Sequence, residues 1–461
     1  MQAKFAKLTE DWMLRGWSDV PCAVANWTNG DERMLRKKGA YVAKACDGQT
    51  DFESIAFLGE HRVLLDKLIE QGIAEACACG DALDPRQQFR KAPNPHIKGI
   101  HWCVTGLCNL NCRHCYMEAP SGRYGQLPFE DMLRLIDQFE RANVHEVSVT
   151  GGEPFVRQDL LDILEALAQK RIRLSGIYTN GVLVTGETLE RIKGLGFAPS
   201  LQISFDGCGA HDQMRGTSGI ESCVIEAIKI ARSSNLKVAV ATCIDTTNVC
   251  QLGPTYDMMK RLDIDTWRIA QPLEIGNWRG ATTALSIQEQ FDALVPLARQ
   301  WRDDGMPLSV EFGGFLRGSK DPETGRFSEL HIQYVAESHD CGSCREQPNL
   351  LPDGTLLPCP AYTDSSLQHR MPNLLREDLS DVWTDSPLRA LADLRKADLL
   401  KCNPDCATCE LFKDCGMGCR ASALMETGDL MAKDPLACVL WKEGYKQRFR
   451  EAVGLDGERE A

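Results

Sequence analysis

Three cysteines, Cys108, Cys112 and Cys115, lie close together in the segment 108–116. Thiolates are preferred protein ligands of iron-sulfur clusters. Three thiolates can hold three irons of a four-iron cluster and leave the fourth iron without a protein ligand. The spacing therefore predicts a cluster whose open iron is a place for chemistry.

A second group of cysteines follows residue 340, where the chain has little regular hydrophobic periodicity. Its members are Cys341, Cys344, Cys359, Cys402, Cys406, Cys409, Cys415, Cys419 and Cys438. We do not expect the 21 cysteines of this chain to form a disulfide framework, because a chain of 461 residues needs no such cross-links to be stable. Metal ligation is the simplest explanation, with iron-sulfur clusters favoured and a structural zinc ion as the alternative.

The composition indicates a globular protein of about two to four domains. A formal net charge of -13 argues against nucleic acid as the main partner, because proteins that bind nucleic acids usually present a basic face. The chain begins with no apolar signal segment and contains no stretch of roughly 18 apolar residues, the length that a membrane span needs. We therefore expect a cytoplasmic protein without a membrane or nucleic-acid partner.

The hydrophobic pattern divides the chain into three parts, with expected boundaries at 1–96, 97–315 and 316–461. The first part combines a strand-like segment at 22–27 with a helical pattern that stops at Gly72, which indicates a small α+β unit. The polar, proline-bearing run 85–95 predicts a linker. The third part comprises a bridging region and the cysteine-rich segment.

The second part alternates short apolar runs with amphipathic helical patterns. The runs predict strands at 97–105, 147–150, 176–179, 201–205, 238–243 and 267–270. Six strand-helix units in series with right-handed crossovers predict a full or partial (β/α)6 barrel in an α/β fold. The chemistry of such barrels lies at the carboxyl ends of the strands, and the first three cysteines follow the first strand.

The three-cysteine run resembles the signature of the radical S-adenosylmethionine (radical SAM) enzymes, and later segments of the barrel match that family in order. The resemblance implies that Cys108, Cys112 and Cys115 hold a [4Fe-4S] cluster whose open iron binds SAM. An electron from the cluster then cleaves SAM to methionine and a 5'-deoxyadenosyl radical. This radical removes a hydrogen atom from a substrate.

The same resemblance implies a set of SAM contacts at the barrel rim. These are Tyr116, Gly151, Gly152, Glu153, Asn180, Ser204, Asp206 and Arg215. Tyr116 would lie near the adenine, and the two glycines would let backbone carbonyls approach the SAM amino group. Glu153 would hold either this turn or the ammonium.

Three of these contacts have two possible roles each. Ser204 could bond either the ribose or the carboxylate of SAM. Arg215 offers a fork of donors to the SAM carboxylate, and a structural salt bridge is the alternative. Asn180 either contacts SAM or caps its own loop.

The C-terminal cysteines resemble the SPASM extension, which holds auxiliary four-iron clusters. The resemblance implies that Cys341, Cys344, Cys359 and Cys419 bind auxiliary cluster I. It assigns Cys406, Cys409, Cys415 and Cys438 to auxiliary cluster II. If only one of Cys341 and Cys344 is a ligand, cluster I has an open iron; Cys402 is surplus.

The N-terminal part resembles the winged-helix element that peptide-maturing enzymes use to capture a leader peptide. The segments that carry this resemblance are 44–48 and 64–73. Such an element adds the leader as a strand to a sheet edge.

Together the resemblances imply a maturase for a ribosomally made precursor peptide, reduced by a donor such as flavodoxin or ferredoxin. Two auxiliary clusters that accept an electron favour a net oxidative cross-link, such as a cysteine thioether. Epimerisation or a carbon-carbon cross-link are alternatives. Epimerisation needs a thiol that returns a hydrogen atom, and Cys208, Cys223, Cys243 and Cys250 remain available in the barrel, although buried small hydrophobes are their plainer role.

Other functions are also compatible with the sequence. Sulfatase-type maturases also have SPASM clusters, but they carry an acidic residue where this chain has Pro360. A tetrapyrrole-modifying SPASM enzyme and a non-catalytic peptide-binding iron-sulfur protein are further alternatives. The intact three-cysteine motif with Gly151, Gly152 and Glu153 disfavours the non-catalytic interpretation.

Overall fold

A parallel sheet forms the centre of the computed structural model, which describes residues 4–53, 59–320, 327–329 and 332–455. Its consecutive parallel strands are β7 (Gly99–Cys103), β8 (Glu146–Thr150), β9 (Arg173–Thr179), β10 (Ser200–Ser204), β11 (Val238–Cys243), β12 (Thr266–Ala270) and β13 (Ser309–Phe312). The strands β7 to β12 coincide with the six predicted segments. The α/β fold with a partial barrel is therefore confirmed.

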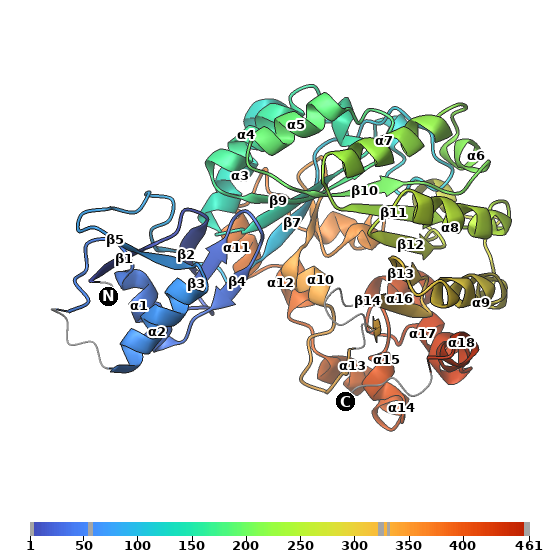
Figure 1. Ribbon diagram of the computed structural model, residues 1–461. Coiled ribbons are helices and arrows are strands. Elements are labelled where there is room, and N and C mark those ends of the chain that lie inside the picture. Colours follow the sequence, from blue (N-terminus) through green and yellow to red (C-terminus); the bar gives the residue numbers. More distant parts are fainter. Residues whose placement is uncertain (1–3, 54–58, 321–326, 330–331, 456–461) are drawn as a thin grey trace.

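Helices connect these strands and cover the sheet. They are α3 (Phe129–Arg141), α4 (Leu160–Gln169), α5 (Gly186–Gly194), α6 (His211–Arg215), α7 (Glu221–Ser233), α8 (Leu252–Arg261) and α9 (Ile287–Asp303). Each long helix buries one apolar stripe; in α3 this stripe is Met132, Leu135, Ile136 and Phe139. Figure 1 shows α3, α4, α5 and α7 along one side of the strands. Loops follow the carboxyl ends of the strands and form that rim of the barrel.

Both edges of the parallel sheet are extended by segments from the C-terminal half of the chain. At one edge, β16 (Asn349–Leu350) pairs in parallel with β7, and β17 (Leu356–Leu357) pairs with β16. At the other edge, the antiparallel strands β14 (Leu316–Lys320) and β15 (Phe327–Glu329) follow β13. The cysteine-rich part is therefore joined to the barrel through the sheet itself.

Short helices make up most of the cysteine-rich part. They are α10 (Gly342–Glu346), α11 (Leu379–Thr384), α12 (Pro387–Ala392), α13 (Lys396–Cys402), α14 (Pro404–Ala407), α15 (Phe412–Cys415), α16 (Arg420–Thr427), α17 (Pro435–Lys442) and α18 (Tyr445–Val453). In Figure 1 the helices α13 to α18 lie below the barrel, on the side away from α4 and α5. Within the described ranges, no helix has the length and apolar character to cross a bilayer.

The N-terminal unit has its own apolar core, which includes Trp12, Leu14, Val42 and Leu65. Its elements are β1 (Phe5–Leu8), β2 (Trp12–Gly16), β3 (Ala23–Asn26), β4 (Glu32–Met34), α1 (Lys37–Ala45), α2 (Gly59–Glu70), β5 (Ala74–Cys77) and β6 (Arg90–Lys91). One sheet has the order β4-β3-β2-β6, and β1 pairs with β5. The expected linker 85–95 thus contains a strand, β6, because its extended proline-flanked backbone pairs with β2.

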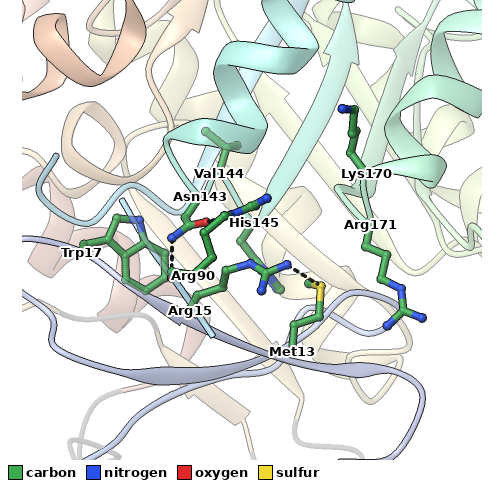
Figure 2. A pocket seen from close by; sticks show the side chains of 9 residues that line it. All are labelled: Met13, Arg15, Trp17, Arg90, Asn143, Val144, His145, Lys170 and Arg171. Atoms are coloured by element: carbon green, nitrogen blue, oxygen red, sulfur yellow. Dashed lines mark hydrogen bonds between the residues drawn. The ribbon is translucent and has the colours of Figure 1, made fainter. Parts of the chain in front are cut away.

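The N-terminal unit packs against the barrel through a buried polar contact (Figure 2). The indole of Trp17 donates to the carbonyl of Ala142 at 3.1 Å, and the amide of Asn143 donates to the carbonyl of Gly16 at 2.9 Å. Burial and the nearby Arg90 lower the pKa of Arg15 to about 9. The space among these side chains is about 10 Å³, which suffices for a single water at most. This contact is a packed interface and not a ligand site.

Candidate active site

The three-cysteine loop follows β7 at the rim of the barrel. The backbone N–H groups of Leu110 and Ala119 point at the sulfur atoms of Cys108 and Cys115, each at 3.4 Å. Burial, with smaller effects of the two neighbouring thiols, raises the pKa of Cys108 to about 12. The thiolate forms that an iron cluster requires therefore depend on the cluster itself for stabilisation.

Gly151 and Gly152 directly follow β8 and pack against the start of the cysteine loop. The N–H of Gly152 donates to the carbonyl of Thr105 at 2.8 Å, and the N–H of Glu153 donates to the carbonyl of Leu107 at 2.9 Å. A Cβ atom at Gly151 would collide with the Thr105 carbonyl, and one at Gly152 would collide with the Leu107 carbonyl. Gly151 also has a φ of 148°, which side chains disfavour. The glycines therefore fix the distance between β8 and the cysteine loop.

Glu153 is completely buried and ties the ends of β8 and β9 together. Its carboxylate accepts hydrogen bonds from the Thr179 hydroxyl at 2.9 Å, the Asn180 N–H at 2.7 Å and the Phe155 N–H at 3.1 Å. Burial raises the pKa of Glu153 to about 7, although these three donors act in the opposite direction. These hydrogen bonds hold the turn, and a contact of Glu153 with the SAM ammonium stays a prediction.

Asn180 connects the end of β9 to the cysteine loop. Its side-chain amide donates to Asn109 at 2.8 Å and points at the Cys108 sulfur at 3.8 Å, while its carbonyl accepts from the Val182 N–H at 3.0 Å. Asn180 therefore caps its loop and also reaches the cluster motif. The loop-capping role is thus observed, and a contact of Asn180 with SAM stays a prediction.

Asp206 and Arg215 form a buried ion pair next to the cysteine loop. The Nε of Arg215 lies 2.6 Å from the Asp206 carboxylate, and its Nη1 points at the Cys112 sulfur at 3.7 Å. Burial opposes ionisation of Asp206, but Arg215, His114 and His211 outweigh it, so the pKa of Asp206 lies below its usual value. Arg215 thus forms the structural salt bridge that the sequence left as an alternative.

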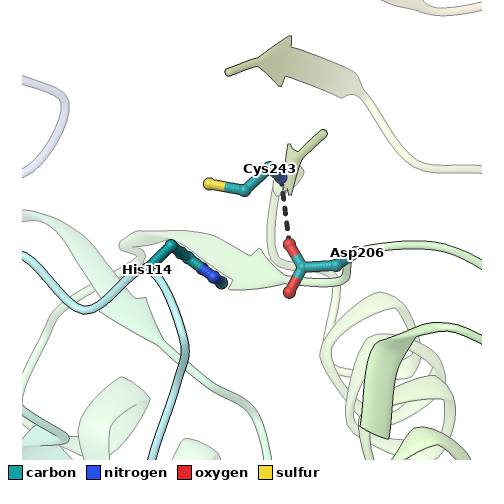
Figure 3. Close-up of side chains that lie close together, drawn as sticks. All are labelled: His114, Asp206 and Cys243. Atoms are coloured by element: carbon teal, nitrogen blue, oxygen red, sulfur yellow. Dashed lines mark hydrogen bonds between the residues drawn. The ribbon is translucent and has the colours of Figure 1, made fainter. Parts of the chain in front are cut away.

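His114, Asp206 and Cys243 converge beside this ion pair, as Figure 3 shows. Their ligand atoms all lie within 4.8 Å of one another, and the Cys243 N–H donates to Asp206 at 2.9 Å. Arg215 already neutralises Asp206, so this trio lacks the free carboxylate that a metal ion would need. His114 was not expected from the sequence, since a histidine between two cysteine ligands carries no spacing signal of its own.

Ser204 and Tyr116, two further expected SAM contacts, lie at the same rim. Ser204 is the last residue of β10, where it pairs with Ala241 of β11. The hydroxyl of Tyr116 lies 3.9 Å from the Cys103 sulfur, and burial raises the pKa of Tyr116 well above its usual value. Tyr116 packs against an apolar cluster that also contacts Cys108, Cys115 and Cys359. This cluster joins the first cysteine site to the C-terminal part.

The four cysteines that the sequence assigns to auxiliary cluster II line one cavity. Cys406, Cys409, Cys415 and Cys438 share it with Leu411, Phe412, Met417, Lys433, Trp441 and Lys442. Two lysines and apolar side chains around four thiols suit a cluster that carries negative charge. Cys402 does not line this cavity and is exposed.

The four cysteines assigned to auxiliary cluster I are also neighbours. Cys359 comes just after β17, and its pKa, raised to about 12 mainly by burial, is also raised by Cys419 and Cys341. Burial raises the pKa of Cys344, and Cys341 and Cys359 add to this effect. The structure thus brings Cys341 and Cys344 to the same site, and the number of ligands that they supply stays a prediction.

The spacing of these thiols distinguishes an iron cluster from a single zinc ion. Four thiolates at about 2.3 Å from one zinc lie about 4 Å from each other. Among the residues that the structure describes, no three cysteines have sulfur atoms within 4.8 Å of one another. A four-iron cluster is a larger body and holds its thiolates farther apart, so four thiols that are not in close contact suit such a cluster.

The comparisons with known proteins agree with this geometry. Residues 102–259 match the Radical SAM superfamily, and residues 341–410 match SPASM, an iron-sulfur cluster-binding domain. The chain is 25% identical over 351 residues to an AdoMet-dependent heme synthase of Nitratidesulfovibrio vulgaris, which covers 74% of this chain and 92% of that protein. It is 26% identical over 354 residues to the mycofactocin maturase MftC of Mycobacterium tuberculosis, which covers 76% of this chain and 84% of MftC.

Among solved structures, Streptococcus suis SuiB bound to its precursor peptide SuiA has the same fold. The superposition has a TM-score of 0.65 at 18% sequence identity and covers 94% of this chain and all of SuiB (100%). The likeness thus extends beyond the two matched domains. This chain is a radical SAM enzyme with a C-terminal SPASM iron-sulfur domain.

Proposed function

We propose that this enzyme matures a ribosomally made precursor peptide by an oxidative cross-link. The observation that carries the proposal is a basic groove on an N-terminal unit that packs against the barrel. Similarity to MftC and to the SuiB fold, which has been solved with a precursor peptide, supports a peptide substrate. A cysteine thioether is the proposed bond, with a carbon-carbon bond as its closest alternative.

The groove lies beside β4 and α1 and has a volume of about 570 Å³. Its lining combines apolar and cationic side chains: Pro21, Cys22, Leu35, Arg36, Lys37, Ala40, Tyr41 and Lys44. None of these lining residues is acidic, although the whole chain has a net charge of -13. The groove therefore suits an extended segment with acidic and apolar residues.

The strand β4 offers a backbone edge next to this groove. It is the terminal strand of its sheet and pairs only with β3 in the described part of the chain. Asp31 and Leu35 hydrogen-bond toward β3, so the alternate residues Glu32 and Met34 direct their backbone groups outward. An extended leader peptide can add to this edge as a further strand.

The barrel rim supplies the reactive site. There the three cysteines would hold a [4Fe-4S] cluster with bound SAM, which would supply a radical for hydrogen abstraction from the peptide. Cys108, Cys112 and Cys115 are the proposed ligands of that cluster. Gly151 and Gly152 hold their loop against β8, where SAM is proposed to bind.

The two auxiliary sites favour the oxidative outcome. Cys341, Cys344, Cys359 and Cys419 are the proposed ligands of one auxiliary cluster, and Cys406, Cys409, Cys415 and Cys438 are those of the other. The apolar cluster that contacts both Cys115 and Cys359 spans the space between the SAM site and the first auxiliary site. The electron left on the substrate can leave by this route, and a flavodoxin or ferredoxin is the proposed donor of the first electron.

The test uses the anaerobically reconstituted protein with SAM, a reductant and a candidate precursor peptide, sought as a short reading frame beside its gene. We expect 5'-deoxyadenosine and a peptide that has lost two hydrogens per cross-link, measured by mass spectrometry. The Cys108→Ala/Cys112→Ala/Cys115→Ala variant is the negative control. Absence of 5'-deoxyadenosine with and without peptide would contradict the enzyme's proposed reaction, and an unchanged peptide mass with an inverted residue would establish epimerisation instead.

Tetrapyrrole modification is a second candidate, because the similarity to the heme synthase of N. vulgaris extends over 74% of this chain. The same reconstituted protein can be given a tetrapyrrole in place of the peptide. Consumption of the tetrapyrrole coupled to 5'-deoxyadenosine, with no change in any peptide, would favour this candidate. The N-terminal groove favours the peptide.

A further inference from the structure

Lys396 is a buried cation between the two auxiliary sites. Its side chain is 1% exposed, and its ammonium lies 2.7 Å from the carboxylate of Asp340. The same ammonium donates to the carbonyl of Gly416 and lies 4.6 Å from the centre of the Tyr334 ring. A lysine this deeply buried needs such partners to remain charged.

The partners of Lys396 belong to both cysteine sites. Asp340 directly precedes Cys341 of the first site, and Gly416 directly follows Cys415 of the second. The pKa of Tyr334 is raised by burial, and then by Asp340, Cys341 and Cys415. The tyrosine ring beneath the ammonium is therefore close to one thiol of each site.

The glycine in this arrangement is required by its surroundings. Gly416 has a φ of 53°, and a Cβ atom there would collide with the ring of Tyr334. A side chain at this position would push the ring away from the ammonium. The local backbone is thus adapted to the contact between Lys396 and Tyr334.

Two more buried charged side chains, Arg420 and Asp434, lie near Cys419 of the first site. Arg420, which follows Cys419, lies 3.4 Å from Asp340 and donates to the carbonyls of Met417 and Ala432. Asp434 accepts from the N–H of Cys419 at 3.0 Å and caps α17, the helix that carries Cys438. Lys396 and Arg420 both approach Asp340, so the loss of either cation changes the charge beside Cys341.

We infer that Lys396 is a positioning residue that raises the reduction potentials of both auxiliary clusters together. The inference rests on the proposed cluster ligands. A cluster gains negative charge when it is reduced, and a fixed cation nearby stabilises that state. Because Lys396 contacts the backbone or neighbours of both sites, its loss lowers the two potentials in the same direction.

The experiment measures the auxiliary potentials by redox titration followed by electron paramagnetic resonance. It uses the full chain with Cys108, Cys112 and Cys115 replaced by alanine, so that only auxiliary signals contribute. The variants are Lys396→Met, which removes the cation, and Asp340→Asn, which removes its counter-charge. Lys401→Met is the matched control, since Lys401 lies on the same helix, is exposed and pairs with Asp398.

The charges of Lys396 and Asp340 predict that their two variants shift the auxiliary reduction potentials in opposite directions. Lys396→Met shifts both auxiliary potentials downward, Asp340→Asn shifts them upward, Lys396→Arg restores values close to those of the parent, and Lys401→Met changes nothing. Shifts of the same sign in Lys396→Met and Asp340→Asn, or no shift with full iron content, would overturn the inference. A merely structural role would reduce iron content in both variants without opposite shifts.

Iron content separates the remaining outcomes. If Lys396→Met loses iron, the double variant Lys396→Met/Asp340→Asn shows whether the unpaired carboxylate of Asp340 is the cause. The double variant leaves no unpaired buried charge at this pair. Recovered iron with potentials below those of Asp340→Asn supports the inference, because the two variants then differ only by the lysine cation; unrecovered iron or unshifted potentials overturn it. A parent protein that binds neither auxiliary cluster would contradict the proposed ligand sets themselves, whereas a parent with both clusters and unshifted variants contradicts the role of Lys396 alone.

Discussion

Arg215 and Asp206 bind each other: the Nε of the arginine lies 2.6 Å from the carboxylate, and both side chains are buried. This pair anchors α6 to the end of β10, directly beside the three-cysteine loop. The remaining Nη1 of Arg215 points at the Cys112 sulfur at 3.7 Å. Arg215 thus contacts both a buried carboxylate and one of the proposed cluster ligands, and its contact with the SAM carboxylate stays a prediction.

Replacing Arg215 by methionine is expected to destabilise the fold by about 3–5 kcal/mol, because Asp206 would remain buried without its partner. Denaturant unfolding of the anaerobic protein measures this loss. The Asp206→Asn/Arg215→Met variant should recover part of it, since both charges are then gone. Equal losses in the single and double variants would show that the charge of Asp206 is not the cause.

The buried carboxyl of Glu153 gives a pH dependence with a defined sign. Its folded pKa is about 7 against 4.5 for the free group, so the folded chain holds this proton more tightly than the unfolded chain does. The stability that this group contributes is therefore full below about pH 4.5 and is lost as pH rises from there through about 7, by about 3 kcal/mol in total.

The measurement compares unfolding free energies of the wild type and Glu153→Gln in the absence of SAM, between pH 5 and pH 8. The glutamine does not titrate, so the stability of the wild type relative to this variant should fall across the interval. A constant difference would mean that Glu153 is ionised throughout. Gly152→Ala is a companion variant that should displace the cysteine loop without altering the pH dependence.

Removal of the three cysteines of the SAM site should separate the sites by iron content. The Cys108→Ala/Cys112→Ala/Cys115→Ala variant is expected to lose about four irons per chain and all 5'-deoxyadenosine formation. The Cys406→Ala/Cys409→Ala variant should lose a similar amount of iron and keep SAM cleavage without peptide. Cys402→Ala is the control, because Cys402 is exposed and lies outside the cysteine cavity; a loss of iron there would require a different ligand set.

Charge reversal in the N-terminal groove should weaken peptide binding. For Arg36→Glu/Lys37→Glu we expect a Kd raised about tenfold or more, because two cations that face the groove become anions. Fluorescence anisotropy of a labelled precursor peptide reports this, and SAM cleavage without peptide should stay unchanged. Lys237→Glu, an exposed reversal at the start of β11, is the matched control. Equal weakening by both variants would point to overall charge and not to the groove.

Cys243 tests the choice between cross-linking and epimerisation. Burial raises the pKa of Cys243 to about 12, so it remains a thiol that is able to donate a hydrogen atom. For an oxidative cross-link we expect Cys243→Ala to retain the loss of two hydrogens from the peptide. The exposed Cys223 provides a control in Cys223→Ala. Loss of product only in Cys243→Ala, together with an inverted residue in the wild-type product, would favour an epimerase.

Much of the fold was predictable from local pattern. Strands are rich in β-branched and apolar residues, so segments such as 147–150 and 238–243 are evident without any tertiary information. The first cysteines were equally evident, because their ligands are close in sequence and follow a strand. The sequence by itself therefore determined the fold class and the type of chemistry.

Contacts between distant segments were decided only by the tertiary structure. The strands β16 and β17 have two residues each and carry no periodic signal, yet β16 pairs with β7 at the edge of the barrel. The roles of Arg215 and Lys396 depend on partners that spacing does not reveal: Asp206 in the loop after β10, and Asp340, 56 residues earlier in the chain. A buried charge is stable only where folding supplies its counter-charge, and that match is a property of three-dimensional packing.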